Sequence, residues 1–461
     1  AFGLELTVSQ VIWLGRFTNV LLSTATIWLT YLIGRQFYNR SIGLIGSGLL
    51  AVAMLHATNE SRFALVDIPA TFCVTLLLWL CAKTQAISFR RAVWLGVIVG
   101  IGFAVKFTTV FAGLSAAALL FLISERFRPS DFLLKLAAVI GVAGATFTII
   151  CPYWLLDLVS TEWNLFFDAL LYESSHYQRG HFGLFATGDI NWLNRFTYLW
   201  TLLRWGMGTP LALLAIVGTV LALIQRKDGD KILLAFVIPY LLFIGSHKLK
   251  FVRHLLLIYP VLTLLAAGCI DRLGTALSKR NWTRRNLTLK QWAAPILYAV
   301  ILGGVGLYSL IYTAAFADVT RSIPTTVEAT EWIESNIPPD TAIEREPEIL
   351  FDWLLPKLDR EDSGAGAEWV LVLMPNAEVF LNYAAKPTHY SAIDWYPLES
   401  VDIEAAMEFY ERIFEEPSQY TLVQRFQRQP RFLGIPISDQ GAPFPMRALT
   451  HPEIRVYQSR E

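Results

Sequence analysis

The stretch NESRFALVDIP at residues 59–69 places three charged side chains between two long apolar runs. The three are Glu60, Arg62 and Asp67. Charge beside segments long enough to span a membrane is costly and usually serves a function. We therefore interpret these residues as candidates for a catalytic site at a membrane surface, in which Asp67 assists proton transfer or orients Arg62. A structural alternative is that Asp67 caps the helix that starts with the following Ile-Pro pair.

The composition is that of an integral membrane protein. Hydrophobic residues make up 54% of the 461 residues, charged residues only 16%, and the mean hydropathy is +0.45. A soluble globular protein has about 25% charged residues. Lys and Arg dominate residues 1–317, whereas Asp and Glu dominate residues 318–461, although the formal net charge of the chain is zero. This split predicts a membrane domain, 1–317, followed by an acidic soluble domain, 318–461.

The apolar runs predict a polytopic α-helical membrane protein with about ten spans. Alternate connections between these runs are rich in Lys and Arg, and the positive-inside rule places such connections in the cytoplasm. The remaining connections, including residues 58–67, 153–208 and 247–253, then face outward with everything after residue 314. The expected spans are 11–33, 41–57, 68–83, 92–107, 109–124, 133–152, 209–225, 231–246, 254–271 and 291–313.

One connection that should face outward is basic, against this rule. Residues 246–254 contain Lys248, Lys250, Arg253 and His254, and Lys106 lies in another outward turn. Lys and Arg bind phosphate through charge-assisted hydrogen bonds, so these residues are candidates for a lipid-phosphate site. Snorkelling of long side chains at the membrane interface is the alternative.

The long connection at 153–208 is rich in aromatic residues, which predicts a loop lying on the bilayer surface. It contains His176, Tyr177 and His181, which we interpret as residues that hydrogen-bond a sugar or another polar acceptor. With the nearby Glu173 the histidines form a weak pattern for a metal site. The spacing of the acidic residues leaves a divalent cation undecided, and plain solvent-exposed histidines remain an alternative.

Residues 318–461 read as a small α/β domain outside the membrane. Helices are expected at 325–336, where Thr325 and Glu328 fit a capping box, and at 403–416. Strands are expected at 369–374, 420–423 and 454–457. No catalytic pattern is seen in this domain, so a lid or an acceptor-binding module is the expected role.

Three segments together resemble polyprenol-dependent glycosyltransferases of the GT-C type. They are Arg62–Pro69, which is similar to the second acidic motif of that group, His247–Pro260 and Trp332–Pro338. The nearest group is the bacterial relatives of dolichyl-phosphate-mannose–protein mannosyltransferases and lipid A aminoarabinose transferases. The resemblance implies inverting transfer of a sugar from a polyprenyl-phosphate donor to a lipid, glycan or protein acceptor. It also implies a location in the bacterial cytoplasmic membrane, with the soluble domain outside the cytoplasm.

The sequence departs from that group at its start. Family members carry a catalytic Asp in the first outer loop, and Glu5 is the only acid before residue 60. We therefore expect the chain to lack its N-terminal part, with the main catalytic acid upstream of Ala1. Two non-enzymatic functions stay open as alternatives: a transporter or lipid flippase, and a partner in cell-envelope assembly.

Overall fold

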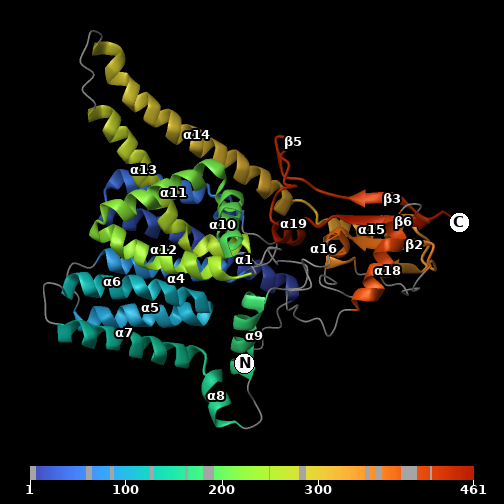
Figure 1. Cartoon of the computed structure of the whole chain (residues 1–461), viewed down its shortest axis with the longest axis horizontal. Coiled ribbons are helices and arrows are strands. Elements are labelled where there is room, and N and C mark those ends of the chain that lie inside the picture. Colours follow the sequence, from blue (N-terminus) through green and yellow to red (C-terminus); the bar gives the residue numbers. More distant parts are fainter. Residues whose placement is uncertain are drawn as a thin grey trace.

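The structure is a helical body joined to a smaller domain that contains a β-sheet (Figure 1). The body comprises the N-terminal two thirds of the chain, and the C-terminus lies at the far end of the smaller domain. The computed structural model describes residues 7–58, 65–83, 88–124, 129–160, 165–179, 192–248, 250–279, 287–347, 354–356, 358, 366–385, 402–415 and 418–460.

Each of the ten apolar runs overlaps helical structure. By length and composition, five helices of the described residues are able to cross a membrane: α1, α7, α12, α13 and α14. The fold of a helical integral membrane protein is thereby confirmed, while ten spans remain a prediction. The helical segments of the body are α1 (Val8–Phe37), α2 (Arg40–Ala51), α3 (Met54–Thr58), α4 (Asp67–Ala82), α5 (Phe89–Val105), η1 (Phe107–Ala112), α6 (Gly113–Ser124), α7 (Pro129–Ile150), α8 (Tyr153–Val159), α9 (Leu165–Arg179), α10 (Trp192–Met207), α11 (Thr209–Gln225), α12 (Asp228–Ser246), η2 (Val252–Ile258), α13 (Tyr259–Lys279) and α14 (Leu287–Arg321).

Helix α13 is the centre of the body, because it packs against α1, α2, α11 and α14. Small residues permit this close packing. A Cβ atom at Gly218 of α11 would lie 2.2 Å from the carbonyl oxygen of Leu265, and one at Gly34 of α1 would lie 2.5 Å from the Leu264 side chain. Close backbone approach through small residues is a common way to join membrane helices, where lipid offers no hydrophobic drive for association.

The connection at 153–208 contains the helices α8, α9 and α10, and its expected place on the bilayer surface remains a prediction. Helix α10 buries Leu202, Leu203 and Met207 in the core of the body. Asp157 of α8 accepts hydrogen bonds from the backbone N–H groups of Phe166 and Phe167, at 2.6 and 3.2 Å. These N–H groups belong to the first turn of α9, which has no intrahelical acceptor for them, so Asp157 fixes how α9 begins.

The C-terminal domain has a four-stranded sheet of order β1-β2-β6-β3. Strands β1 and β2 are parallel, and β6 is antiparallel to both of its neighbours. The expected helices and strands are confirmed with shifts of a few residues. The elements are α15 (Thr325–Asn336), β1 (Ile343–Arg345), β2 (Trp369–Leu373), α16 (Met374–Ala385), α18 (Ile403–Phe414), β3 (Tyr420–Phe426), β4 (Arg431–Phe432), β5 (Ile435–Pro436), α19 (Phe444–Thr450) and β6 (Ile454–Ser459).

The capping box expected at the start of α15 is wrong. Pro324 occupies the N-cap position, and no side chain caps the helix there. Thr325 instead donates a 2.6 Å hydrogen bond to the backbone carbonyl of Pro452. The threonine therefore ties α15 to the segment before β6, an interaction between residues far apart in the sequence that a local pattern does not reveal.

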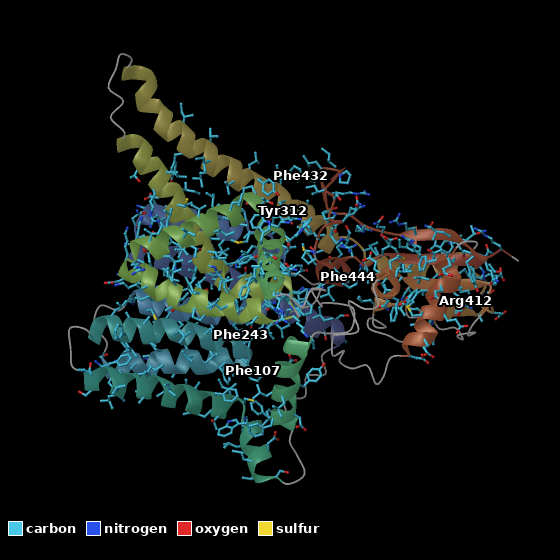
Figure 2. All side chains as sticks on the ribbon, viewed as in Figure 1. Phe107, Phe243, Tyr312, Arg412, Phe432 and Phe444 are labelled. Carbon is cyan, nitrogen blue, oxygen red and sulfur yellow. The ribbon has the colours of Figure 1, made fainter. Side chains whose placement is uncertain are left out.

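The two parts of the chain meet around α14 and the segment from β4 to α19. The β4 strand packs against α14, with Phe432 and Tyr312 at this junction (Figure 2). Ala442 and Met446 belong to the hydrophobic core of the helical body, although they lie between strands of the C-terminal domain in the sequence. Helix α14 continues beyond residue 317 to Arg321, and the division at residue 317 remains a prediction.

Candidate functional site

Asp67 lies at the first turn of α4 and is buried, with 2% of its surface exposed. The capping interpretation is wrong: Val66 is the N-cap residue, and no side chain makes a cap hydrogen bond. The chain is held here by Asn19 of α1, whose side-chain amide donates to the carbonyl of Leu65 at 3.1 Å. A carboxylate in the first helical turn is favoured by the helix dipole, so the α4 backbone supports a charged Asp67.

Two cations from distant parts of the sequence meet the Asp67 carboxylate. Lys106 Nζ lies 2.6 Å from Oδ1, and Arg253 Nε lies 4.0 Å from Oδ2. Lys106 follows the last residue of α5, where its extended backbone ends the helix. Arg253, in the first turn of η2, stacks on the ring of Phe251 at 3.8 Å. The side chains of both cations keep about a fifth of their surface exposed, 18% and 19%, whereas Asp67 keeps 3%.

A second pair of cations, Lys250 and Arg195, lies at the connection that contains Arg253. Lys250 is 1% exposed, and its Nζ has no hydrogen-bond partner among the described residues. Its ammonium lies 6.0 Å from the ring centre of Tyr198 in α10. One turn earlier, Arg195 donates from Nη1 to the carbonyl of Ser246 at 2.9 Å. Burial, with a smaller effect of the Arg195 charge, lowers the pKa of Lys250 to about 7.

The two remaining residues predicted to bind phosphate are Lys248 and His254. Lys248 is half-buried in the bend before Lys250. His254 is buried, and its Nδ1 accepts a hydrogen bond from the Phe251 backbone N–H at 3.4 Å. The backbone carbonyl of His254 accepts from Tyr240 at 2.5 Å. His254 is therefore part of the packing that fixes η2, while its role toward phosphate remains a prediction.

Several predicted residues fall outside the described part of the chain. Glu60, Arg62 and His181 belong to segments that the structure does not describe. His176 and Tyr177 lie within the bounds of α9, but their side chains are not among those described. In the described residues, no group of three or more His, Cys, Asp or Glu is arranged to hold a metal ion. Among the described residues, Asp67 forms ion pairs with Lys106 and Arg253.

Two residues near the site, Arg195 and Glu173, are not among the site residues that the sequence predicts. Arg195 sits in an aromatic-rich segment interpreted as surface loop, and only its helical fold brings it to Lys250. Glu173 of α9 was considered only with the histidines, yet it lies close enough to Lys106 for their charges to interact. Partial burial raises the pKa of Glu173, and Lys106 opposes this. The Phe107 and Phe166 rings, 6.1 Å apart, hold the start of α9 beside η1.

The arrangement carries excess positive charge. Asp67 lies within 4.0 Å of two cations, Lys106 and Arg253, whose side chains remain partly exposed. Fixed cations bind phosphate and stabilise the negative charge that develops on a phosphate leaving group. Because Asp67 contacts both open cations, it is suited to hold them in position rather than to act alone.

Comparison with known proteins supports the resemblance seen in the sequence. The family model described as dolichyl-phosphate-mannose-protein mannosyltransferase matches residues 1–155. No curated protein matches the sequence. The structure is similar to that of ArnT from Cupriavidus metallidurans bound to undecaprenyl phosphate, with 13% identity, a TM-score of 0.49 and coverage of 82% of this chain and 75% of that chain. It is also similar to the oligosaccharyltransferase AglB from Archaeoglobus fulgidus in complex with an inhibitory peptide and a dolichol-phosphate, with 12% identity, a TM-score of 0.42 and coverage of 96% and 77%. The family match confirms, over about a third of the chain, the resemblance to polyprenol-dependent GT-C glycosyltransferases that the sequence predicts.

Proposed function

We propose that the protein is a membrane glycosyltransferase that takes a sugar from a polyprenyl-phosphate donor. The observation that carries this proposal is the buried Asp67 with Lys106 and Arg253 around it, within a chain whose first 155 residues match a glycosyltransferase family. Apolar helices offer a surface for the polyprenyl tail, and the two partly open cations suit its phosphate. An acceptor hydroxyl or amine attacks the anomeric carbon, and the polyprenyl phosphate leaves.

In this proposal the residues have separate roles. Lys106 and Arg253 bind the phosphate and stabilise it as the leaving group, and Asp67 positions both. Lys250 and Arg195 add positive charge behind them. Glu173 is the carboxylate that we propose as base toward the acceptor, because it lies near Lys106 and partial burial raises its pKa, which makes it a stronger base. Attack by the acceptor from the side opposite the leaving phosphate gives inversion at the anomeric carbon.

The proposal also includes orientation. The basic alternate connections place the site and the C-terminal domain on the extracytoplasmic side of the cytoplasmic membrane. A cysteine introduced in place of Lys248 tests this orientation. We expect a membrane-impermeant reagent to label it in intact cells. Protection of that cysteine until the membrane is opened would reverse the orientation.

Binding of undecaprenyl phosphate to the purified protein tests the phosphate site directly. We expect Lys106→Met and Arg253→Met each to weaken binding by about tenfold or more, since a charge-assisted hydrogen bond contributes about 1.5–3 kcal/mol. Lys231→Met is a matched control, because Lys231 forms an exposed pair with Asp228 at 3.1 Å. Equal affinity of all four proteins would exclude the phosphate site, and lipid movement without sugar transfer would favour a flippase.

A further inference from the structure

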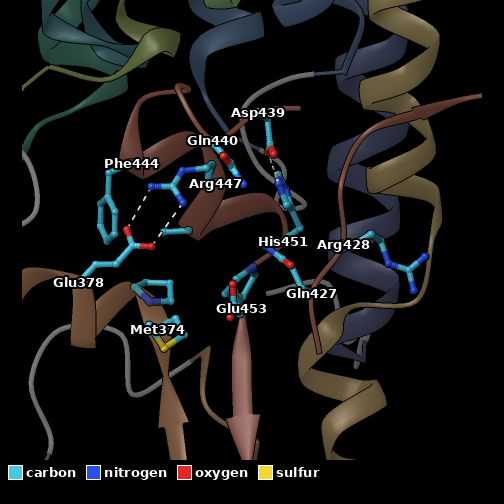
Figure 3. A pocket seen from close by; sticks show the side chains of 13 residues that line it. Met374, Glu378, Gln427, Arg428, Asp439, Gln440, Phe444, Arg447, His451 and Glu453 are labelled. Carbon is cyan, nitrogen blue, oxygen red and sulfur yellow. Dashed lines mark hydrogen bonds and ion pairs between the residues drawn. The ribbon is translucent and has the colours of Figure 1, made fainter. Parts of the chain in front are cut away.

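A pocket in the C-terminal domain lies apart from the Asp67 site. It is an open pocket between the start of α16, the end of β3, α19 and the start of β6, and its space, open solvent included, is about 420 Å³ (Figure 3). Its lining combines the ring of Phe444 with exposed amides of Gln427 and Gln440. The sequence showed no pattern here, because these residues come from separate elements.

The charged side chains of the lining all have partners of opposite charge. Glu378 and Arg447 form a two-pronged pair, with N–O distances of 3.1 and 3.4 Å. His451 Nε2 lies 2.5 Å from Asp439 Oδ2, and both side chains are buried. Figure 3 shows both pairs at the pocket. The two others pair outward: Arg428 with Glu328, and Glu453 with Arg425 and Arg455.

These pairings argue against an ion as the ligand. A phosphate or carboxylate would have to compete with Glu378 for Arg447, and a cation would compete with Arg447 for Glu378. A neutral ligand with several hydroxyl groups fits better, because amides and paired charges each offer both donors and acceptors. The electron-rich face of an aromatic ring attracts polarised C–H groups such as those on one face of a pyranose.

From this lining we propose that the C-terminal domain binds a neutral pyranose sugar in the pocket between Phe444, Gln427 and Gln440. The Glu378–Arg447 pair would bridge adjacent hydroxyls, and the buried Asp439–His451 pair fixes α19 and the Gln440 segment behind them. The inference does not depend on the transfer reaction proposed above, because it concerns equilibrium binding by another part of the chain.

Saturation-transfer NMR on the full chain in lipid nanodiscs tests this with a panel of neutral methyl hexopyranosides. A ligand of this size is expected to bind with a Kd on the order of 1 mM. Gln427→Ala combined with Gln440→Ala should weaken binding by about tenfold, since two neutral hydrogen bonds are lost. Gln424→Ala is the matched control: its amide is on β3 outside the pocket, and binding should stay within about twofold.

Four outcomes would overturn the proposal. One is no saturable binding of any glycoside up to about 50 mM. Another is equal affinity of the double variant and wild type. The third is tighter binding of methyl glucuronide than of the neutral glycosides. Addition of undecaprenyl phosphate should not displace the sugar, and displacement would place it at the Asp67 site instead. Sugar binding that persists in Lys106→Met, where donor binding is lost, separates this proposal from the proposed function.

Discussion

Two buried carboxylates, one in each part of the molecule, are stabilised in opposite ways. Asp67 in the helical body meets the cations Lys106 and Arg253. Among the described residues, Glu346 in the C-terminal domain accepts from neutral donors: the Leu373 backbone N–H at 3.0 Å, the Asn376 amide at 2.5 Å and the Tyr410 hydroxyl at 2.9 Å.

The difference between these surroundings has a chemical consequence. Burial raises the pKa of Glu346 to about 8, although its three hydrogen bonds oppose the rise. The Asn376 amide oxygen has no hydrogen-bond partner among the described residues, and with the amide turned over it can accept from the protonated carboxyl. Glu346 thus suits a structural role as a neutral acid, whereas Asp67 sits among cations that remain partly open. Burial alone therefore does not mark a site, whereas burial beside partly exposed cations does.

The largest expected effect comes from breaking the charged arrangement. Asp67→Asn leaves Lys106 without its partner, and loss of one member of a buried pair costs about 3–5 kcal/mol. If that energy positions the cations for catalysis, sugar transfer by membranes falls by about 10²–10³-fold or more. Transfer within about threefold of wild type would remove Asp67 from the site. Asp228→Asn, at an exposed pair, is the control.

The next largest effect is the pH dependence of stability that Glu346 causes. Its folded pKa lies above the unfolded value, so the folded state binds more protons and stability falls as pH rises from about 4.5 to about 8. The full effect is roughly 5 kcal/mol or less. Glu346→Gln stays neutral and should gain thermal stability relative to wild type between pH 5 and pH 8, measured by intrinsic fluorescence. A stability difference that does not change with pH would contradict the neutral acid.

A smaller effect is expected at Lys250. Its pKa of about 7 means that it is charged below that pH and neutral above it. The attraction of Lys250 for undecaprenyl phosphate should therefore fall by about tenfold between pH 6 and pH 8. Because the lipid phosphate gains charge over the same range, the measured quantity is the ratio of Kd values for wild type and Lys250→Arg, which stays charged. A constant ratio would show that Lys250 does not titrate at the site.

The smallest effect is expected at an exposed carboxylate. Asp131 pairs with Lys135 one turn away on α7, at 2.5 Å, but 43% of its side chain is exposed. Solvent-exposed pairs on helices contribute about 0.3–0.5 kcal/mol. Asp131→Asn should therefore leave both thermal stability and transfer nearly unchanged. If Asp131→Asn lost as much transfer as Asp67→Asn, loss of an ion pair alone would explain the loss of activity, and the burial of Asp67 beside partly exposed cations would not be needed.

Much of the fold was predictable because local rules govern it. The apolar runs become helices, and the spacing of Ala406, Phe409, Tyr410 and Ile413 correctly predicts the buried face of α18. The failures came where local patterns competed with distant contacts. Thr325 and Asp67 both fit capping patterns, yet each side chain instead interacts with a residue far away in the sequence. The aromatic residues at 153–208 favour a connection on the bilayer surface, whereas Tyr198, Trp200 and Trp205 of α10 pack against the core of the body.

Sequence alone determined that this is a membrane protein with a small acidic α/β domain, because lipid requires the backbone of apolar segments to satisfy its hydrogen bonds within helices. It also identified Asp67, Lys106, Lys250 and Arg253 as charges out of place beside apolar runs. Only the tertiary structure decided which of them meet. The pairing of Asp67 with Lys106 joins residues 39 positions apart, and Arg195 reaches Lys250 only through the packing of α10. Charge partners are set by helix packing, which no local pattern encodes.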